Sequence, residues 1–219
     1  TGLFREDVFA QGYGEENDFC LRATRLGWRH VGVPGVFVAQ TTTDANGNYG
    51  FSGLMPGEYI VEFITPGGYT QTTANVGADA TDSDAGAGGL TGCYLLPSGQ
   101  TNNTVDAGFY RPAAIGDRVW SDTNANGQQD AGEGGVANVT VELYACVADQ
   151  PSGPVLATTT TDASGNYAFT GLVPGDYIVK FITPAGYTLS TANVGADGSD
   201  SDAGAGGLTG CYDLESGET

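Results

Sequence analysis

An internal duplication is the feature that most constrains the fold of this 219-residue chain. Residues 43–101 align with residues 161–219 at a constant offset of 118, and 45 of the 59 aligned pairs are identical. This period is far longer than the roughly 20–50 residues of solenoid repeats, so it indicates duplication of a whole domain. We expect a non-autonomous segment over 1–38, a first repeat over 39–113 that is incomplete at its start, and a second repeat over 114–219 that lacks its final strand.

Each repeat shows the pattern of short β-strands. Residues 139–144 alternate between apolar and polar side chains with a period of two, as a half-buried strand does. Further strands are expected at 166–170 and 176–182, at their counterparts 48–52 and 58–64, and at 104–110. Pro-Gly turns lie between them. The sequence therefore predicts an all-β protein made of tandem β-sandwich domains, after a short mixed N-terminal segment.

The charge excludes several kinds of partner. The chain has 26 Asp and Glu against 7 Lys and Arg, a net charge of −19. Nucleic-acid binding and docking on an anionic membrane both need a basic surface, so neither is expected. No apolar run approaches the ~20 residues of a membrane span, so no membrane insertion is expected.

Residues 122–133 have the ligand spacing of an EF-hand calcium loop. Oxygen-bearing side chains occupy positions 1, 3, 5, 9 and 12, glycine occupies position 6, and position 7 would supply its backbone carbonyl. These candidate ligands are Asp122, Asn124, Asn126, Gln128, Asp130 and Glu133. The flanking residues are strand-like, so we expect the loop without the EF-hand helices. The alternative is a polar turn that binds no metal.

Two acidic loops are candidates for further calcium sites. They contain Asp197, Asp200 and Asp202 in the second repeat and Asp79, Asp82 and Asp84 in the first. Three carboxylates within six residues repel one another unless cations or water screen them. Asp162 or Asp117 could join the site in the second repeat. The alternatives are solvated acidic loops and, for Asp44 and Asp162, hairpin residues with no metal.

The cysteines and the glycosylation patterns both suit an extracellular protein. Cys146 follows a predicted strand and Cys211 lies late in the same repeat, so we expect a disulfide between them, with buried free thiols as the alternative. Cys93, the counterpart of Cys211, could pair with Cys20. Asn102 and Asn138 begin N-glycosylation sequons, and the threonines of 158–161 are candidates for O-glycans.

The loop and turn motifs resemble those of a known family. Ile115–Gly135, with Thr161–Phe169 and Gly171–Tyr177, is similar to the B domain of serine-aspartate-repeat surface adhesins. The resemblance covers 115–219 and, as a copy without its start, 39–112. It implies a collagen-adhesin-B-like (Ig-like) sandwich that binds several Ca²⁺ ions and forms a rigid stalk outside the cell.

Residues 1–38 resemble a different family, the family 2 inverting glycosyltransferases. The similar stretches are 2–9, 12–23 and 27–34, and the resemblance would place Glu16 at the catalytic base. The nucleotide-binding half and the Asp-x-Asp motif are missing, so no enzyme activity is expected.

Two classes of function follow, together with a weaker third. The first is a cell-surface or filament structural protein, in which a neighbouring repeat or subunit could donate the final strand. The second is a module appended to a glycosyltransferase, and the third is a carbohydrate- or protein-binding adhesin module.

Overall fold

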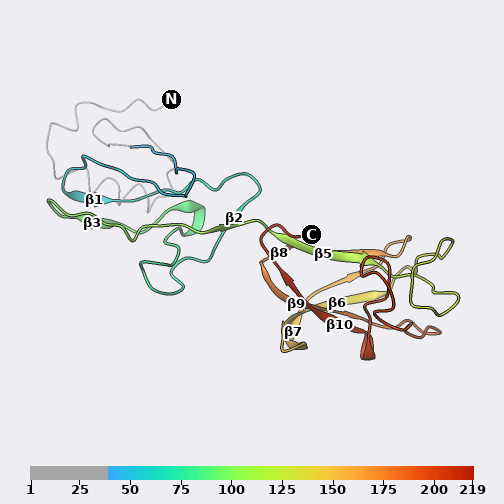
Figure 1. The fold of residues 1–219 in the computed structure, drawn as a ribbon. Helices are drawn as coiled ribbons and strands as arrows, with labels where there is room; N and C mark the ends of the chain where they lie inside the picture. Colours follow the sequence, from blue (N-terminus) through green and yellow to red (C-terminus); the bar gives the residue numbers. More distant parts are fainter. Residues whose placement is uncertain (1–38) are drawn as a thin grey trace, which may run out of the picture. The chain divides into compact units, whose positions relative to one another are not determined.

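The computed structural model describes residues 39–219, in which the regular elements are β-strands and two 3₁₀ turns (Figure 1). The expectation of an all-β protein is confirmed. The described residues form two compact units: 39–63 with 74–106, and 64–73 with 107–219. The first repeat contributes residues to both units, so the boundary at 113/114 stays a prediction.

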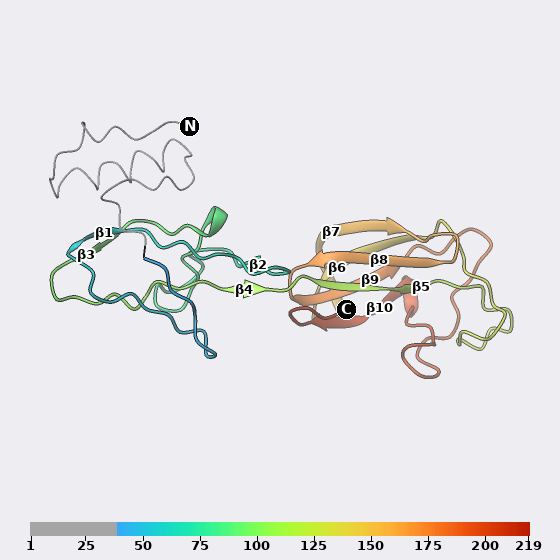
Figure 2. The ribbon, with the colours of Figure 1, turned by 90° about the horizontal axis from the view of Figure 1, so that it is seen from above.

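Two antiparallel sheets form most of the second unit (Figure 2). The larger sheet has the strand order β10–β9–β6–β7, with bounds Leu208–Leu214, Gly175–Phe181, Thr140–Val147 and Gln150–Thr160. The smaller sheet pairs β5 (Ala113–Arg118) with β8 (Asn166–Leu172). A short pair, β2 (Thr70–Gln71) with β4 (Phe109–Tyr110), belongs to the same unit.

The core of the second unit joins side chains of both sheets. Val141 and Leu143 of β6 and Val179 of β9 are fully buried, and they cluster with Phe169 of β8. Val141 and Leu143 are two residues apart, so they lie on the same face of their strand. The alternating pattern of 139–144 thus marked the buried face correctly, and the packing of the two sheets makes this unit a β-sandwich.

A disulfide links two strands of the larger sheet. Cys146 of β6 and Cys211 of β10 are bonded, with 5.8 Å between their Cα atoms and 65 residues between them in sequence. Both strands pair with β9, so the bond ties together the two neighbours of that strand. The predicted pairing is confirmed. Cys93 is an exposed free thiol, and Cys20 lies outside the described residues.

The first unit has much less regular structure. β1 (Gly57–Tyr59) pairs with β3 (Tyr94–Leu96), and a 3₁₀ turn, η1, spans Ala87–Gly89; its counterpart in the second unit is η2 (Ala205–Gly207). Ala85 is the one buried apolar residue among the described residues of this unit. Tyr49 packs edge-to-face on Phe63, with ring centroids 5.4 Å apart.

Three strand predictions for the first repeat were wrong in extent. Residues 48–52 form no strand, 58–64 shortens to β1, and 104–110 shortens to β4. The reason is that residues 39–219 contain no strands that pair with these segments over their full length. In the second repeat the counterpart of 48–52 is β8, which pairs with β5, and β9 pairs with β6. Residues 39–63 have no described strands equivalent to β5 and β6 beside them.

Candidate calcium-binding loops

The polar side chains of the loop 122–133 form hydrogen bonds with other groups of the same loop. Asn124 and Asn126 both donate side-chain amide hydrogens to the same oxygen of Asp130, at 2.8 and 2.9 Å. The side-chain carbonyl of Asn124 accepts the N–H of Asn126, and that of Asn126 accepts the N–H of Gln128. Three of the predicted ligands are therefore within hydrogen-bond distance of one another.

The two ends of the loop are held by its first and last carboxylates. Asp122 accepts the N–H groups of Gly127, at 2.8 Å, and Asn126. Burial opposes ionisation of Asp122, but these bonds outweigh it and lower the pKa of its carboxyl. Glu133 is buried and accepts the N–H of Thr123 at 2.7 Å and that of Asp130 at 3.0 Å.

Gly127 is required by the geometry of the loop. Its φ is +80°, and a Cβ there would collide with the backbone carbonyl of Thr191. This is the glycine that the spacing placed at position 6 of the loop.

The tertiary structure brings the predicted calcium loop beside the acidic loop 197–202. Gln128 forms a β-bridge with Asp200, and the N–H of Gln129 donates to the carbonyl of Ser199 at 2.8 Å. Ser201 donates its N–H to the carbonyl of Gly127 at 2.9 Å. Two motifs some 70 residues apart therefore form one polar region.

Asp200 carries an unpartnered oxygen inside this region. Its side chain is 4% exposed; one oxygen accepts the N–H of Gly195, and the other is buried without a hydrogen-bond partner. A buried carboxylate oxygen without a partner costs free energy, which a cation would offset. Burial raises the pKa of the nearby Asp202, and the charges of Asp197, Asp200 and Asp117 raise it further.

The first repeat reproduces this acidic cluster and adds one residue. Asp82 again has a buried oxygen without a partner, and Asp84 is buried. Asp106 is the residue that the sequence patterns missed. Burial, followed by the charges of Asp84, Asp82 and Asp79, raises its pKa. The sequence signal that could have identified Asp106 was its position in the expected strand 104–110.

Asp162 and Asp44 act as hairpin residues. One oxygen of Asp162 accepts the N–H groups of Ser164 and Asn166, and Asp44 does the same with Asn46 and Asn48. These bonds lower the pKa of both carboxyls. This is the alternative that the sequence left open, and the bonds tie Asp162 to its own turn rather than to the 197–202 loop.

The donor chemistry fits a hard cation. Carboxylate, side-chain amide and backbone carbonyl oxygens are the ligands that Ca²⁺ prefers, and the EF-hand-like loop supplies all three kinds. Within residues 39–219, no three His, Cys, Asp or Glu side chains are grouped closely enough to hold a metal ion. A cation in the loop would therefore depend on the Asn side chains and the Gln128 carbonyl as well as on the acids.

The candidate glycosylation residues differ in accessibility. Asn102 and Asn138 are exposed. Thr161 is 3% exposed, and its hydroxyl donates to the carbonyl of Val136. The prediction of O-glycosylation at Thr161 was therefore wrong, because the hydroxyl is inside the domain.

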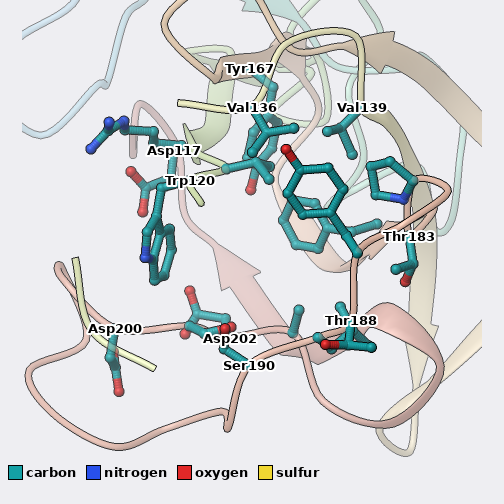
Figure 3. Close-up of a pocket in the computed structure, with 18 residues that line it drawn as sticks. Asp117, Trp120, Val136, Val139, Tyr167, Thr183, Thr188, Ser190, Asp200 and Asp202 are labelled. Atoms are coloured by element: carbon teal, nitrogen blue, oxygen red, sulfur yellow. The ribbon is translucent and has the colours of Figure 1, made fainter. Parts of the chain in front are cut away.

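A pocket lies beside the acidic loop of the second repeat (Figure 3). Tyr167, Ser190 and Asp202 border it together with Trp120, Val139 and Thr188. Burial raises the pKa of Tyr167, and the charges of Tyr212, Asp117 and Asp202 raise it further.

Comparison with known proteins identifies the family. The family model described as "SdrD B-like domain" matches residues 31–109 and 113–219. Serine-aspartate repeat-containing protein F of Staphylococcus epidermidis is 40% identical over 193 residues, covering 88% of this chain and 10% of the relative. Serine-aspartate repeat-containing protein C of Staphylococcus aureus strain Newman is 44% identical over 186 residues, covering 79% of this chain and 19% of the relative.

One solved structure shows a remote likeness. The GBS52 minor pilin of Streptococcus agalactiae aligns with a TM-score of 0.33 and 17% identity, over 62% of each chain. That likeness is too low to support a conclusion.

The comparisons also test the predicted resemblance of residues 1–38. Neither the family model nor these relatives support the resemblance of residues 1–38 to glycosyltransferases, and the first family match begins at residue 31. Across residues 39–219, no helix has the length and apolar character needed to cross a membrane. With two tandem family matches over nearly the whole sequence, the chain belongs to the SdrD B-like domain family of cell-surface proteins.

Proposed function

We propose that this chain is a stalk segment of its cell-surface protein, stiffened by Ca²⁺ and by the Cys146–Cys211 disulfide, and that it catalyses no reaction. Its relatives contain serine-aspartate repeats and are five to ten times longer than the matched segment, which suits a role as one part of a longer surface protein. Its partners are then the neighbouring repeats of the same protein. Glycans at Asn102, Asn138 or the exposed threonines of 158–160 would decorate the stalk.

The observation that carries the calcium proposal is the compact loop 122–133, in which the side chains of Asn124, Asn126 and Asp130 lie within hydrogen-bond distance of one another. On binding, the two Asn amides would turn to present their oxygens in place of the N–H groups that now face Asp130. In the proposed site, Asp122, Asn124, Asn126, Asp130 and Glu133 bind Ca²⁺ through side-chain oxygens. Gln128 binds through its backbone carbonyl. The bound ion supplies positive charge that neutralises the carboxylates; it takes part in no reaction.

Each acidic loop forms a second site in this proposal. Asp197, Asp200 and Asp202 supply the ligands in the second repeat, and Asp79, Asp82 and Asp84 supply them in the first. The buried unpartnered oxygens of Asp200 and Asp82 support this assignment. Asp162 stays a weaker candidate, because its hydrogen bonds tie it to its own hairpin turn rather than to the loop 197–202.

Calcium would stabilise the stalk through binding linkage. A ligand that binds the folded chain alone stabilises it by about 2.7 kcal/mol at one hundred times its Kd. Because the loop 122–133 is bonded to the loop 197–202, ordering of one by a cation would also order the other.

Calorimetric unfolding of the full chain tests this proposal. We expect the melting temperature to be several degrees higher in millimolar Ca²⁺ than in chelator, and Asp122→Ala/Glu133→Ala to remove most of that difference. The matched control is Asp149→Asn/Asp176→Asn, which removes two exposed acids outside the loops. Identical melting in calcium and chelator would refute the metal sites.

A further inference from the structure

Two Asn-Gly pairs occur in the chain, Asn46–Gly47 and Asn126–Gly127. Asparagine side chains deamidate most readily in this dipeptide, because glycine has no Cβ to keep its backbone nitrogen away from the preceding side chain. The two pairs have different surroundings in the structure, so they should differ in reactivity.

Hydrogen bonds hold both reacting groups of the pair Asn126–Gly127. The N–H of Gly127 donates to the Asp122 carboxylate at 2.8 Å, and Gly127 is buried. The side-chain amide of Asn126 donates to Asp130 at 2.9 Å, and its side-chain carbonyl accepts the N–H of Gln128 at 2.8 Å. Deamidation needs the glycine nitrogen to lose its proton and the asparagine side chain to turn towards that nitrogen. Both changes would break these bonds, so the loop opposes the reaction.

The pair Asn46–Gly47 lies in the exposed hairpin 44–48, where the two residues are less constrained. Beyond the chain neighbours of Gly47, no described atom lies within 4 Å of the position that a Cβ would take there. The N–H of Gly47 donates to the backbone carbonyl of Asp44 at 3.0 Å, an exposed bond whose acceptor water can replace. Among residues 39–219, no hydrogen bond holds the side-chain amide of Asn46, so this side chain can turn towards the nitrogen.

We propose that Asn46 is a site of spontaneous deamidation and that the loop 122–133 protects Asn126 from the same reaction. The backbone nitrogen of Gly47 loses its proton and attacks the side-chain carbonyl carbon of Asn46, so a C–N bond forms as the C–NH₂ bond breaks. The released NH₂ group takes up the proton and leaves as ammonia. Water then opens the cyclic imide at either carbonyl, which gives aspartate or isoaspartate at position 46. Nothing is oxidised or reduced, and water is the co-reactant.

Either product alters the hairpin of the first repeat. Aspartate adds a negative charge near the Asp44 carboxylate, which accepts the N–H groups of Asn46 and Asn48 at 2.8 and 2.9 Å. Isoaspartate adds a carbon to the backbone of the turn, which is closed by a bond from the Asp44 N–H to the Asn48 carbonyl. Tyr49 follows directly and packs on Phe63, so the modification lies next to an aromatic contact of the first unit. The inference goes beyond the stalk function and does not depend on calcium.

The second repeat contains the same hairpin without the reactive amide. Ser164 takes the place of Asn46, and Asp162 accepts the N–H groups of Ser164 and Asn166 at 2.8 and 2.9 Å. Asn46→Ser is therefore a matched control, because it removes the reacting group and keeps the hydrogen bonds of the turn.

Peptide mapping by mass spectrometry tests the proposal. The full chain is incubated in chelator at mildly alkaline pH in heavy-oxygen water, so that each deamidation incorporates the label, and both Asn-Gly pairs are followed in the same sample. In the folded chain we expect Asn46 to react at least about tenfold faster than Asn126, the effect of a hydrogen bond to a charged group. In guanidinium chloride, where both pairs are exposed, the two rates should be similar. Asn46→Ser should melt at the wild-type temperature and give no product in the hairpin 44–48.

A second variant tests the cause of the protection. Asp122→Ala removes the acceptor of the Gly127 N–H, so Asn126 should deamidate faster than in the wild type while the rate at Asn46 stays the same. A folded-state ratio below about tenfold would overturn the proposal. It would also be overturned by no product at Asn46 over a time in which the unfolded chain reacts, or by an unchanged rate at Asn126 in Asp122→Ala.

Discussion

Removing the Cys146–Cys211 disulfide should cost the second unit much of its stability. The bond closes a loop with a sequence separation of 65. In the chain-entropy description, closing such a loop removes about 14 cal/mol/K from the unfolded ensemble, or about 4 kcal/mol at 25 °C. Small domains are stable by only about 5–15 kcal/mol, so this loss would be a large share of the total.

Urea unfolding of Cys146→Ala/Cys211→Ala measures the loss. Carrying out the series in a Trp28→Phe background leaves Trp120, which lies in the second unit, as the one tryptophan probe. The m-value should also rise, because the unfolded chain without the cross-link exposes more surface.

Two controls separate cross-linking from packing. Reduction of the wild-type disulfide keeps both side chains and should give nearly the same loss. Cys93→Ala changes the exposed counterpart in the first repeat and should alter the free energy of unfolding by less than about 0.5 kcal/mol. A loss below about 1 kcal/mol in both the double variant and the reduced protein would refute the reasoning.

Three further predictions follow from the two repeats and their acids. Phe169→Ala leaves a cavity in the core and should lower the free energy of unfolding, measured in urea, by about 3–5 kcal/mol. Phe51→Ala changes the half-buried counterpart and should lower it by less than half as much. Equal losses in the two variants would contradict an effect of burial. Gly165 has a φ of +85°, and a Cβ there would collide with backbone atoms, whereas Gly47 has a φ of +81° and open space around it. Gly165→Ala should therefore lower the melting temperature more than Gly47→Ala, which should lose only about 1 kcal/mol of the free energy of unfolding. In chelator, a calorimetric pH series should show the melting temperature rising as pH falls from neutral towards the folded-state pKa of Asp202, which is raised above 3.8. Burial and neighbouring acids raise the folded-state pKa of Asp202, so its ionised form destabilises the fold at neutral pH and protonation removes that penalty; Asp202→Asn should flatten the profile, and an unchanged slope would count against this cause.

The sequence predicted local structure correctly where the stabilising interactions join residues that are close in sequence. The alternation of 139–144 predicted the buried face of β6, because side chains of a strand point to opposite sides in turn. The spacing of 122–133 predicted a compact loop with glycine at a left-handed position, because these bonds join residues a few positions apart. The turn at Asp162 follows the same rule.

Strand formation in the first repeat could not be predicted in this way. Residues 48–52 closely match 166–170 in sequence, yet only the second copy is a strand. A strand forms when its backbone groups are paired, and β8 has β5 beside it. The identity of a strand's neighbour is not a property of its own residues.

By itself the sequence determined that the protein is a duplicated, acidic, all-β chain. It also pointed to the candidate calcium loops and to the cysteine pair that the structure shows bonded. Only the tertiary structure decided that the loop 122–133 joins the acidic loop near Asp200, and that Tyr167, Ser190 and Asp202 border one pocket in the second repeat. The physical reason is that both features are made of contacts between segments distant in sequence. Such contacts form when the sheets pack and align the segments, whereas turns and strand periodicity are set by the backbone within a few residues.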